Sequence, residues 1–370
     1  MWSNWRLLRW FTLAAMLSSN IFSAHAEEPN LVARLKELGL STLSGKVPAY
    51  YSSGHRKHAQ KLQAAIEDMN VFYRSRLGVQ ADVSLALLNA EDWKRVTGSE
   101  YSIPQVEGNP YVILMPATSD NPVFGLIESR KDAIPQEQLQ TFLKDHDTTF
   151  AAVVADFVDI IGFHELGHTL NDQFGIDSQN LWFNEFLATY WSYSYISEGQ
   201  PEWKSVFALL GRPSSVRPKN TSLEDFERLY TNVDDYGWYQ GMFERRVQEI
   251  CPRLGLKFLR DLKQKFPRKS GVPWDPKPLD VRMKPNALLE QLEKIAPGFQ
   301  KWAEGFQTAP NPAAGQMGNN RLLAALSAAV DSQTCRLAVA NEQQPCRVGL
   351  WFRRGVDSVS TGTPMALKPS

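Results

Sequence analysis

The stretch from Thr149 to Phe174 constrains the fold of this 370-residue chain most. It lacks proline, carries apolar residues at helical spacing and contains the sequence H-E-x-x-H, so it predicts one long helix. Residues four apart on an α-helix lie one turn above each other, about 5.4 Å along its axis. His164 and His168 can therefore direct both imidazole rings at one metal ion. The alternative is that they are ordinary core histidines, hydrogen-bonded to their neighbours.

A second predicted helix supplies the candidate for a third metal ligand, Glu185. Turn-forming residues from Gly175 to Asn180 separate the two helices, and the second helix runs to about Ser197. An antiparallel helix hairpin would bring the start of the second helix back toward His168. On the first helix, Glu165 projects beside the histidines, where its carboxylate could reach a water on the metal. These four residues predict a hydrolytic centre.

The same residues resemble the motifs of the gluzincins, metallopeptidases that combine H-E-x-x-H with a glutamate ligand on the next helix, often within N-E-x-x-A. Here the second motif reads Asn184-Glu185-Phe186-Leu187-Ala188. More narrowly, the chain is similar to the small secreted peptidase MA-like proteins. The resemblance implies a Zn²⁺ ion held by His164, His168 and Glu185. It also implies that Glu165 is the general base in hydrolysis of a peptide or protein substrate.

Two features depart from the pattern of thermolysin-like enzymes. The gap from His168 to Glu185 is slightly shorter, and Thr189 stands where those enzymes carry an aspartate, four residues after the glutamate ligand. The hydrogen-bond partners of the two histidines are therefore open. Asn171 and Asp172 are candidates, although either could instead cap the end of its helix.

A candidate for stabilising the oxyanion comes from the segment Asp235 to Phe243. It is similar to the Y-x-x-G start of a helix that, in aminopeptidase-like gluzincins, supplies a tyrosine to the oxyanion. Trp238 occupies that tyrosine's place, and Tyr236 and Tyr239 flank it as candidate catalytic donors. An aromatic cluster that packs the subdomain would explain the same residues. The G-x-M-E-N signature of the aminopeptidases is missing from the sequence, which favours an endopeptidase or an unusual specificity.

Residues 1–26 have the pattern of a signal peptide. Arg6 and Arg9 precede an apolar core from Trp10 to Phe22, and Ala24-His25-Ala26 offers a cleavage site. The expectation is an exported protein, periplasmic or extracellular, with no stable membrane insertion after cleavage. An uncleaved membrane anchor is the alternative.

The rest of the chain predicts an α+β fold. Residues 27–147 form an N-terminal α/β sheet subdomain, with a long helix from His55 to Leu77 and several strands, and residues 148–308 form a mostly helical subdomain with both metal motifs. By resemblance to zincins, a small mixed sheet packs on the metal helix, and its edge strand binds extended peptide by β-augmentation. Tyr111 to Met115 is nominated as that edge, with a fully paired interior strand as the alternative.

Composition limits the remaining possibilities. The formal net charge is zero, from 40 basic and 40 acidic residues, so electrostatics give no case for a nucleic-acid partner. A disulfide between Cys335 and Cys346 could close a small loop in an oxidising compartment. Cys251 is expected to be a buried thiol. Residues 309–320 are predicted as a linker, and 321–370 as a partly disordered tail. The sequence indicates no oligomeric state.

A second function class also fits the motifs. A zincin-like binding or assembly protein of the cell envelope would keep the metal scaffold without cleaving peptides. Glu165 argues against it, because a scaffold needs the two histidines but has no use for that base.

Overall fold

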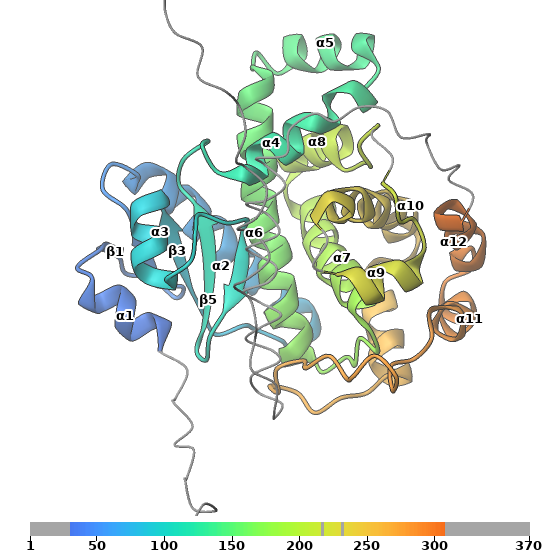
Figure 1. Cartoon of the computed structure of the whole chain (residues 1–370). Coiled ribbons are helices and arrows are strands. Elements are labelled where there is room, and N and C mark those ends of the chain that lie inside the picture. The colour runs from blue at the N-terminus through green and yellow to red at the C-terminus, as the bar shows by residue number, and fades with distance from the viewer. Residues whose placement is uncertain (1–29, 216–217, 231–232, 308–370) are drawn as a thin grey trace, which may run out of the picture.

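The computed structural model describes residues 30–215, 218–230 and 233–307. The predicted signal peptide, linker and C-terminal tail, with Cys335 and Cys346, lie outside these described residues. Figure 1 shows a sheet with its own helices on one side, a group of helices on the other, and α6 (Phe150–Phe174) between them. One hydrophobic cluster includes residues from the sheet, from α6 and from the helical side. The helix that carries H-E-x-x-H is therefore the central element of the fold.

The sheet is mixed, and its five strands lie in the order β1-β2-β3-β5-β4. β2, β3 and β5 are parallel, whereas β1 and β4 pair antiparallel at the two edges. All residues of β3 are buried, as expected for an interior strand with both faces covered. The strands span Ser41–Leu43 (β1), Ala49–Tyr51 (β2), Val83–Leu88 (β3), Gln105–Glu107 (β4) and Tyr111–Pro116 (β5).

Two pairs of helices cover the sheet. α1 (Leu31–Glu37) and α3 (Ala90–Thr97) pack on one face, and α2 (Arg56–Leu77) and α6 on the other. The predicted mixture of helices and a small mixed sheet, packed against the H-E-x-x-H helix, is confirmed at this level. Between the sheet and α6 the chain forms α4 (Pro122–Glu128), a 3₁₀ turn η1 (Ser129–Ala133) and α5 (Gln136–Asp145).

The nomination of Tyr111 to Met115 as the edge strand was wrong. That strand lies inside the sheet, between β3 and β4, so both of its sides are paired. The edge nearest the metal motif is β4, which contacts α6 and reaches β5 through a turn at Gly108. Three residues are too few to establish a period-2 pattern, so β4 could not be detected from the sequence.

The hairpin of α6 and α7 (Leu181–Gly199) follows the sequence prediction. The Thr149 hydroxyl accepts from the Ala152 amide and starts α6, and Gly175, with φ of 82°, ends it. The Asn180 side chain caps the start of α7 in the same way. At the crossing, a Cβ on Gly167 would lie 2.6 Å from the Ala188 carbonyl oxygen. A glycine is therefore needed for the two helices to approach this closely.

The helical side surrounds α7. Its elements are α8 (Pro201–Leu210), α9 (Leu223–Leu229), α10 (Val233–Lys265), α11 (Pro285–Ile295) and α12 (Phe299–Gln307). α10 is interrupted at Gly255, where φ is 49°. Almost every residue of α7 from Leu181 to Ile196 is buried, which is why its sequence is apolar all round rather than amphipathic. Among the described residues, no helix is both long and apolar enough to cross a bilayer.

Candidate metal centre

Three side chains from the α6–α7 hairpin converge on one point. Nε2 of His164 and Nε2 of His168 lie 3.2 Å apart, and the Glu185 carboxylate lies 3.2 Å from the first and 3.7 Å from the second. Ligand atoms around a tetrahedral zinc are about 3.3 Å apart, since the bonds are about 2.0–2.1 Å long. The donor atoms and their spacing therefore fit a metal ion, and these three residues form a group that could hold one.

The outer nitrogens of both histidines have partners. The Thr189 hydroxyl lies 3.1 Å from Nδ1 of His164 and donates to the Glu185 carbonyl oxygen, so it accepts from Nδ1–H. The Asn184 side-chain amide lies 3.1 Å from Nδ1 of His168. The Thr189 contact, in which Nδ1–H of His164 donates, is the arrangement usual for ligand histidines, whereas Nδ1 of His168 accepts from the Asn184 amide nitrogen.

Asn171 and Asp172, proposed from sequence as partners of the histidines, instead hold other parts of the fold. Asn171 donates to the Ile176 carbonyl oxygen and to Ser178, closing the α6–α7 turn. Asp172 accepts from the hydroxyl of Tyr111 and pairs with Arg268. Among the described residues, the hydrogen bonds and the ion pair of these two side chains therefore go to other partners than His164 and His168.

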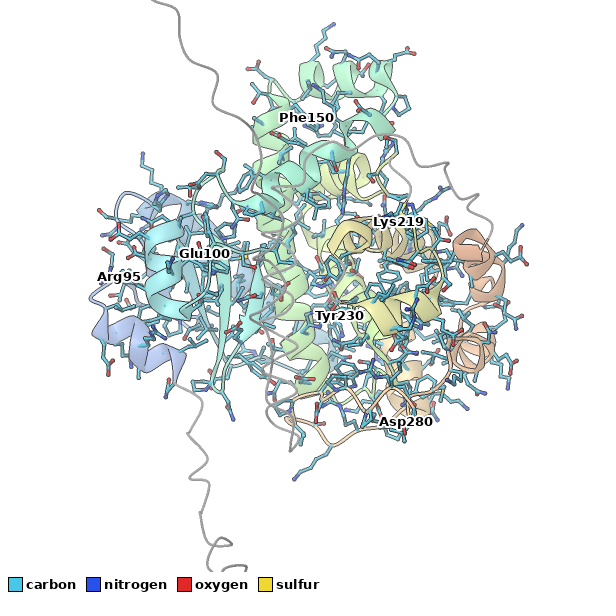
Figure 2. The ribbon with its side chains drawn as sticks, in the orientation of Figure 1. Arg95, Glu100, Phe150, Lys219, Tyr230 and Asp280 are labelled. Atoms are coloured by element: carbon cyan, nitrogen blue, oxygen red, sulfur yellow. The ribbon has the colours of Figure 1, made fainter. Side chains whose placement is uncertain are left out.

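Glu185 is 3% exposed and receives hydrogen bonds from three neutral donors. Tyr230 donates to its Oε1 at 2.8 Å, while Tyr236 and Gln240 donate to its Oε2 at 2.8 and 2.7 Å. Figure 2 labels Tyr230 in the middle of the molecule, on the helical side of α6. A buried carboxylate with these partners is held both in place and in its charged form.

The electrostatics of the three ligands are coupled. Burial alone would raise the pKa of Glu185, but the two imidazoles and the Tyr230 hydroxyl hold it well below its usual range. The pKa of His168 is lowered to about 4, chiefly by burial and also by the neighbouring His164, against the opposing effect of the Glu185 carboxylate. Burial opposes charge on His164 as well, yet hydrogen bonding to Glu185 raises its pKa. The site thus combines one carboxylate with two imidazoles whose pKa values are shifted in opposite directions. This donor set is suited to a divalent cation.

Glu165 lies beside this group on the side facing the sheet. It is 8% exposed, and burial raises its pKa to about 8, with the backbone amide of Val106 in β4 acting in the opposite direction. The carboxyl group therefore lies between the convergence point and the sheet edge. A carboxylate with a pKa near neutrality is suited to accept and return a proton.

The structure separates the two tyrosines nominated from sequence. Tyr236 donates to Glu185, whereas the Tyr239 hydroxyl donates to the carbonyl oxygen of Ser222 at 2.7 Å. Tyr239 packs with Phe226 and Phe306, so it belongs to an aromatic cluster, which was the alternative explanation of this segment. Trp238 likewise packs against Phe306 and Tyr239.

Sequence reasoning missed Tyr230, Gln240, Thr189 and Asn184 as partners of the ligands. Gln240 lies one helical turn after Tyr236 and bonds to its hydroxyl, so the i, i+4 spacing was a usable signal. Tyr230 follows α9 and carried no motif. Apart from this group, His58 of α2 bonds Asp159 of α6 at 2.7 Å, and Lys61 pairs with the same carboxylate.

A pocket opens beside the candidate metal centre, with a volume of about 640 Å³ that includes its solvent-open part. His164, Glu165 and Tyr236 form one end of it, and apolar side chains of α4 and α6 form most of its walls.

No protein-family model matches the chain, and neither a curated protein nor a solved structure does. The residues of the site therefore carry the functional assignment.

Proposed function

We propose that this chain is an exported zinc-dependent metallopeptidase of the gluzincin type. The observation that carries the proposal is the convergence of His164, His168 and Glu185 with Glu165 next to them. Export is supported by the signal-peptide pattern of residues 1–26. A zinc ion bound by the three ligands would polarise a scissile carbonyl and make water more acidic.

Residues of the chain transfer the protons and orient the metal ligands. Glu165 takes the proton of the attacking water as the C–O bond forms, and returns it to the nitrogen of the leaving amine as the C–N bond breaks. Its burial raises its pKa and makes both transfers possible near neutral pH. Thr189 and Asn184 orient the two imidazoles, and Tyr230 orients the Glu185 carboxylate.

Tyr236 is the proposed oxyanion donor. Burial and the charge of Glu185 raise the pKa of its phenol well above the ordinary value, so it stays a neutral O–H donor at any working pH. It also lines the pocket next to His164 and Glu165. Turning its hydroxyl from Glu185 toward a substrate carbonyl leaves Glu185 with the Gln240 donor.

The edge strand β4 is the proposed docking site for an extended peptide. Within the part of the chain that the structure describes, β4 pairs on one side, with β5, and its Val106 amide is next to Glu165. A substrate backbone added along this edge would lie beside the catalytic carboxylate.

The test is the variant Glu165→Gln in the full chain, loaded with zinc and assayed on a peptide mixture with and without chelator. The variant should bind one zinc ion and lose about 10²–10⁴-fold in cleavage rate. Wild-type cleavage by the variant would remove Glu165 from the mechanism. Zinc binding by the wild type without any cleavage would favour the binding or assembly protein of the cell envelope instead.

A further inference from the structure

The pocket beside the metal centre has an apolar wall and a polar far end. Ile127 of α4, Phe157 and Ile160 of α6 and Phe207 of α8 form the wall. Helix register places the far end: Ser192 is about one turn beyond Thr189 on α7, and Glu244 one turn beyond Gln240 on α10. The pocket therefore runs from His164 and Glu165 along α6, away from the metal ligands.

An ion pair closes the far end. Arg130 and Glu244 are 2% and 7% exposed, and the Arg130 Nη1 lies 2.6 Å from the Glu244 Oε2. Arg130 also donates to the Leu210 carbonyl oxygen, and its guanidinium lies over the Phe157 ring. Because the two charges compensate each other, an additional charged group here would be buried without a partner of its own. The end of the pocket therefore accepts a neutral group.

One hydroxyl at this end has no partner. Ser192 is 1% exposed, and its Oγ forms no hydrogen bond among the residues that the structure describes. A buried hydroxyl without a partner is costly, and a ligand that pairs with it gains that hydrogen bond. Together with the apolar wall, Ser192 points to a ligand that is apolar along its length and polar at its tip.

We propose that this pocket is the subsite for one aromatic substrate residue, with tyrosine preferred over phenylalanine because Ser192 pairs with its phenol. The inference rests on the proposed peptidase function, since it assigns the residue next to the scissile bond. Lysine, arginine, aspartate and glutamate are excluded by the compensated ion pair of Arg130 and Glu244. A hydrogen bond between neutral groups corresponds to a preference of about three- to tenfold.

The first experiment measures binding without catalysis, on the full chain. Its probes are p-cresol and toluene, the side-chain analogues of tyrosine and phenylalanine. NMR titration of isoleucine methyl groups locates binding, because Ile127, Ile160 and Ile161 line the pocket. p-Cresol should bind about three- to tenfold more tightly than toluene. If neither probe shifts the pocket methyls, the inference is overturned.

Three variants test how residues of the pocket contribute to binding of the two probes. Ser192→Ala should bring the p-cresol to toluene ratio to about one while toluene affinity is unchanged. Ser194→Ala is the matched control, because Ser194 is equally buried on the same helix and bonds Cys251 rather than lining the pocket. Ile161→Trp fills the pocket from a half-buried position and should weaken both probes. An unchanged ratio in Ser192→Ala would overturn the role of Ser192.

The second experiment reads cleavage of a peptide library by the zinc-loaded protein. Tyrosine should be enriched at one position flanking the cleaved bond, and Ser192→Ala should cleave at tyrosine and phenylalanine equally. Cleavage without aromatic preference overturns the subsite and leaves the peptidase proposal standing. Selective p-cresol binding without any cleavage supports the subsite and contradicts the peptidase proposal.

Discussion

The Thr189 hydroxyl hydrogen-bonds two of the three candidate metal-ligand residues, His164 and Glu185. Its hydroxyl accepts from Nδ1 of His164 at 3.1 Å and donates to the carbonyl oxygen of Glu185 at 3.0 Å. A neutral hydroxyl thus occupies the position where thermolysin-like enzymes carry an aspartate. It fixes the His164 ring with Nδ1–H donating and Nε2 directed at the convergence point, without adding negative charge to the site.

Replacing Thr189 by valine keeps the shape of the side chain and removes this hydrogen bond. Zinc affinity, measured by competition with a chromogenic chelator, should fall about 10–100-fold. Thr169→Val is the matched control, because the Thr169 hydroxyl is buried on α6 and donates to the Leu166 carbonyl oxygen. Equal losses of affinity in the two variants would mean that Thr189 acts only on stability.

Three tyrosines near the site should respond differently to removal of their hydroxyl groups. Tyr236→Phe should lower kcat by about 10²-fold with zinc affinity less affected, since an oxyanion donor acts mainly in the transition state. Tyr230→Phe should weaken zinc binding more than kcat at saturating zinc, because its hydroxyl holds Oε1 of Glu185. Tyr239→Phe, whose hydroxyl bonds Ser222, should retain activity. A loss of kcat in Tyr239→Phe alone would reverse the assignment.

The crossing of α6 and α7 should tolerate no side chain at Gly167. Gly167→Ala places a methyl group 2.6 Å from the Ala188 carbonyl oxygen, so the helices must separate. The free energy of unfolding should fall by about 1–3 kcal/mol, measured by urea denaturation. Gly162→Ala, on the same helix, meets the flexible Met115 side chain at 3.3 Å and the end of the Leu62 side chain at 3.6 Å, and should cost less. Equal effects would show that the close approach of the helices is not what requires glycine.

Zinc binding should release a proton from Glu165. Burial raises its pKa to about 8, so below that pH the carboxyl group is mostly protonated in the metal-free chain. A neighbouring cation favours the carboxylate and lowers this pKa, so at pH 7 zinc should displace close to one proton from this group. Calorimetry in buffers of different ionisation enthalpy measures the release. Glu165→Gln should release about one proton fewer, and the difference should shrink above pH 8; identical release by the two proteins would contradict the account.

The sequence predicted the metal-ligand residues that lie on the α6–α7 hairpin. His164 and His168 share a face because of the helix period, and Glu185 follows from the turn between two recognisable helices. Tyr230 and Gln240 could not be placed in this way, because they reach Glu185 only through the packing of α9 and α10 on α7.

The choice that the sequence left open and the prediction that was wrong have the same physical origin. Tyr236 and Tyr239 are three apart, and the sequence could not decide which of them faced the ligands. The strand at Tyr111 was found, but its place in the sheet depended on β4, which is too short to show alternation. Position within a sheet is a tertiary property that the pattern of a single strand does not contain.

Metal content is the most direct test of the central claim, that His164, His168 and Glu185 hold one zinc ion. Elemental analysis by mass spectrometry should be made on the full chain after zinc loading and desalting. Wild type and Glu165→Gln should each carry about one zinc per chain, and His168→Ala close to none. One zinc per chain retained by His168→Ala, or none bound by the wild type, would contradict the account.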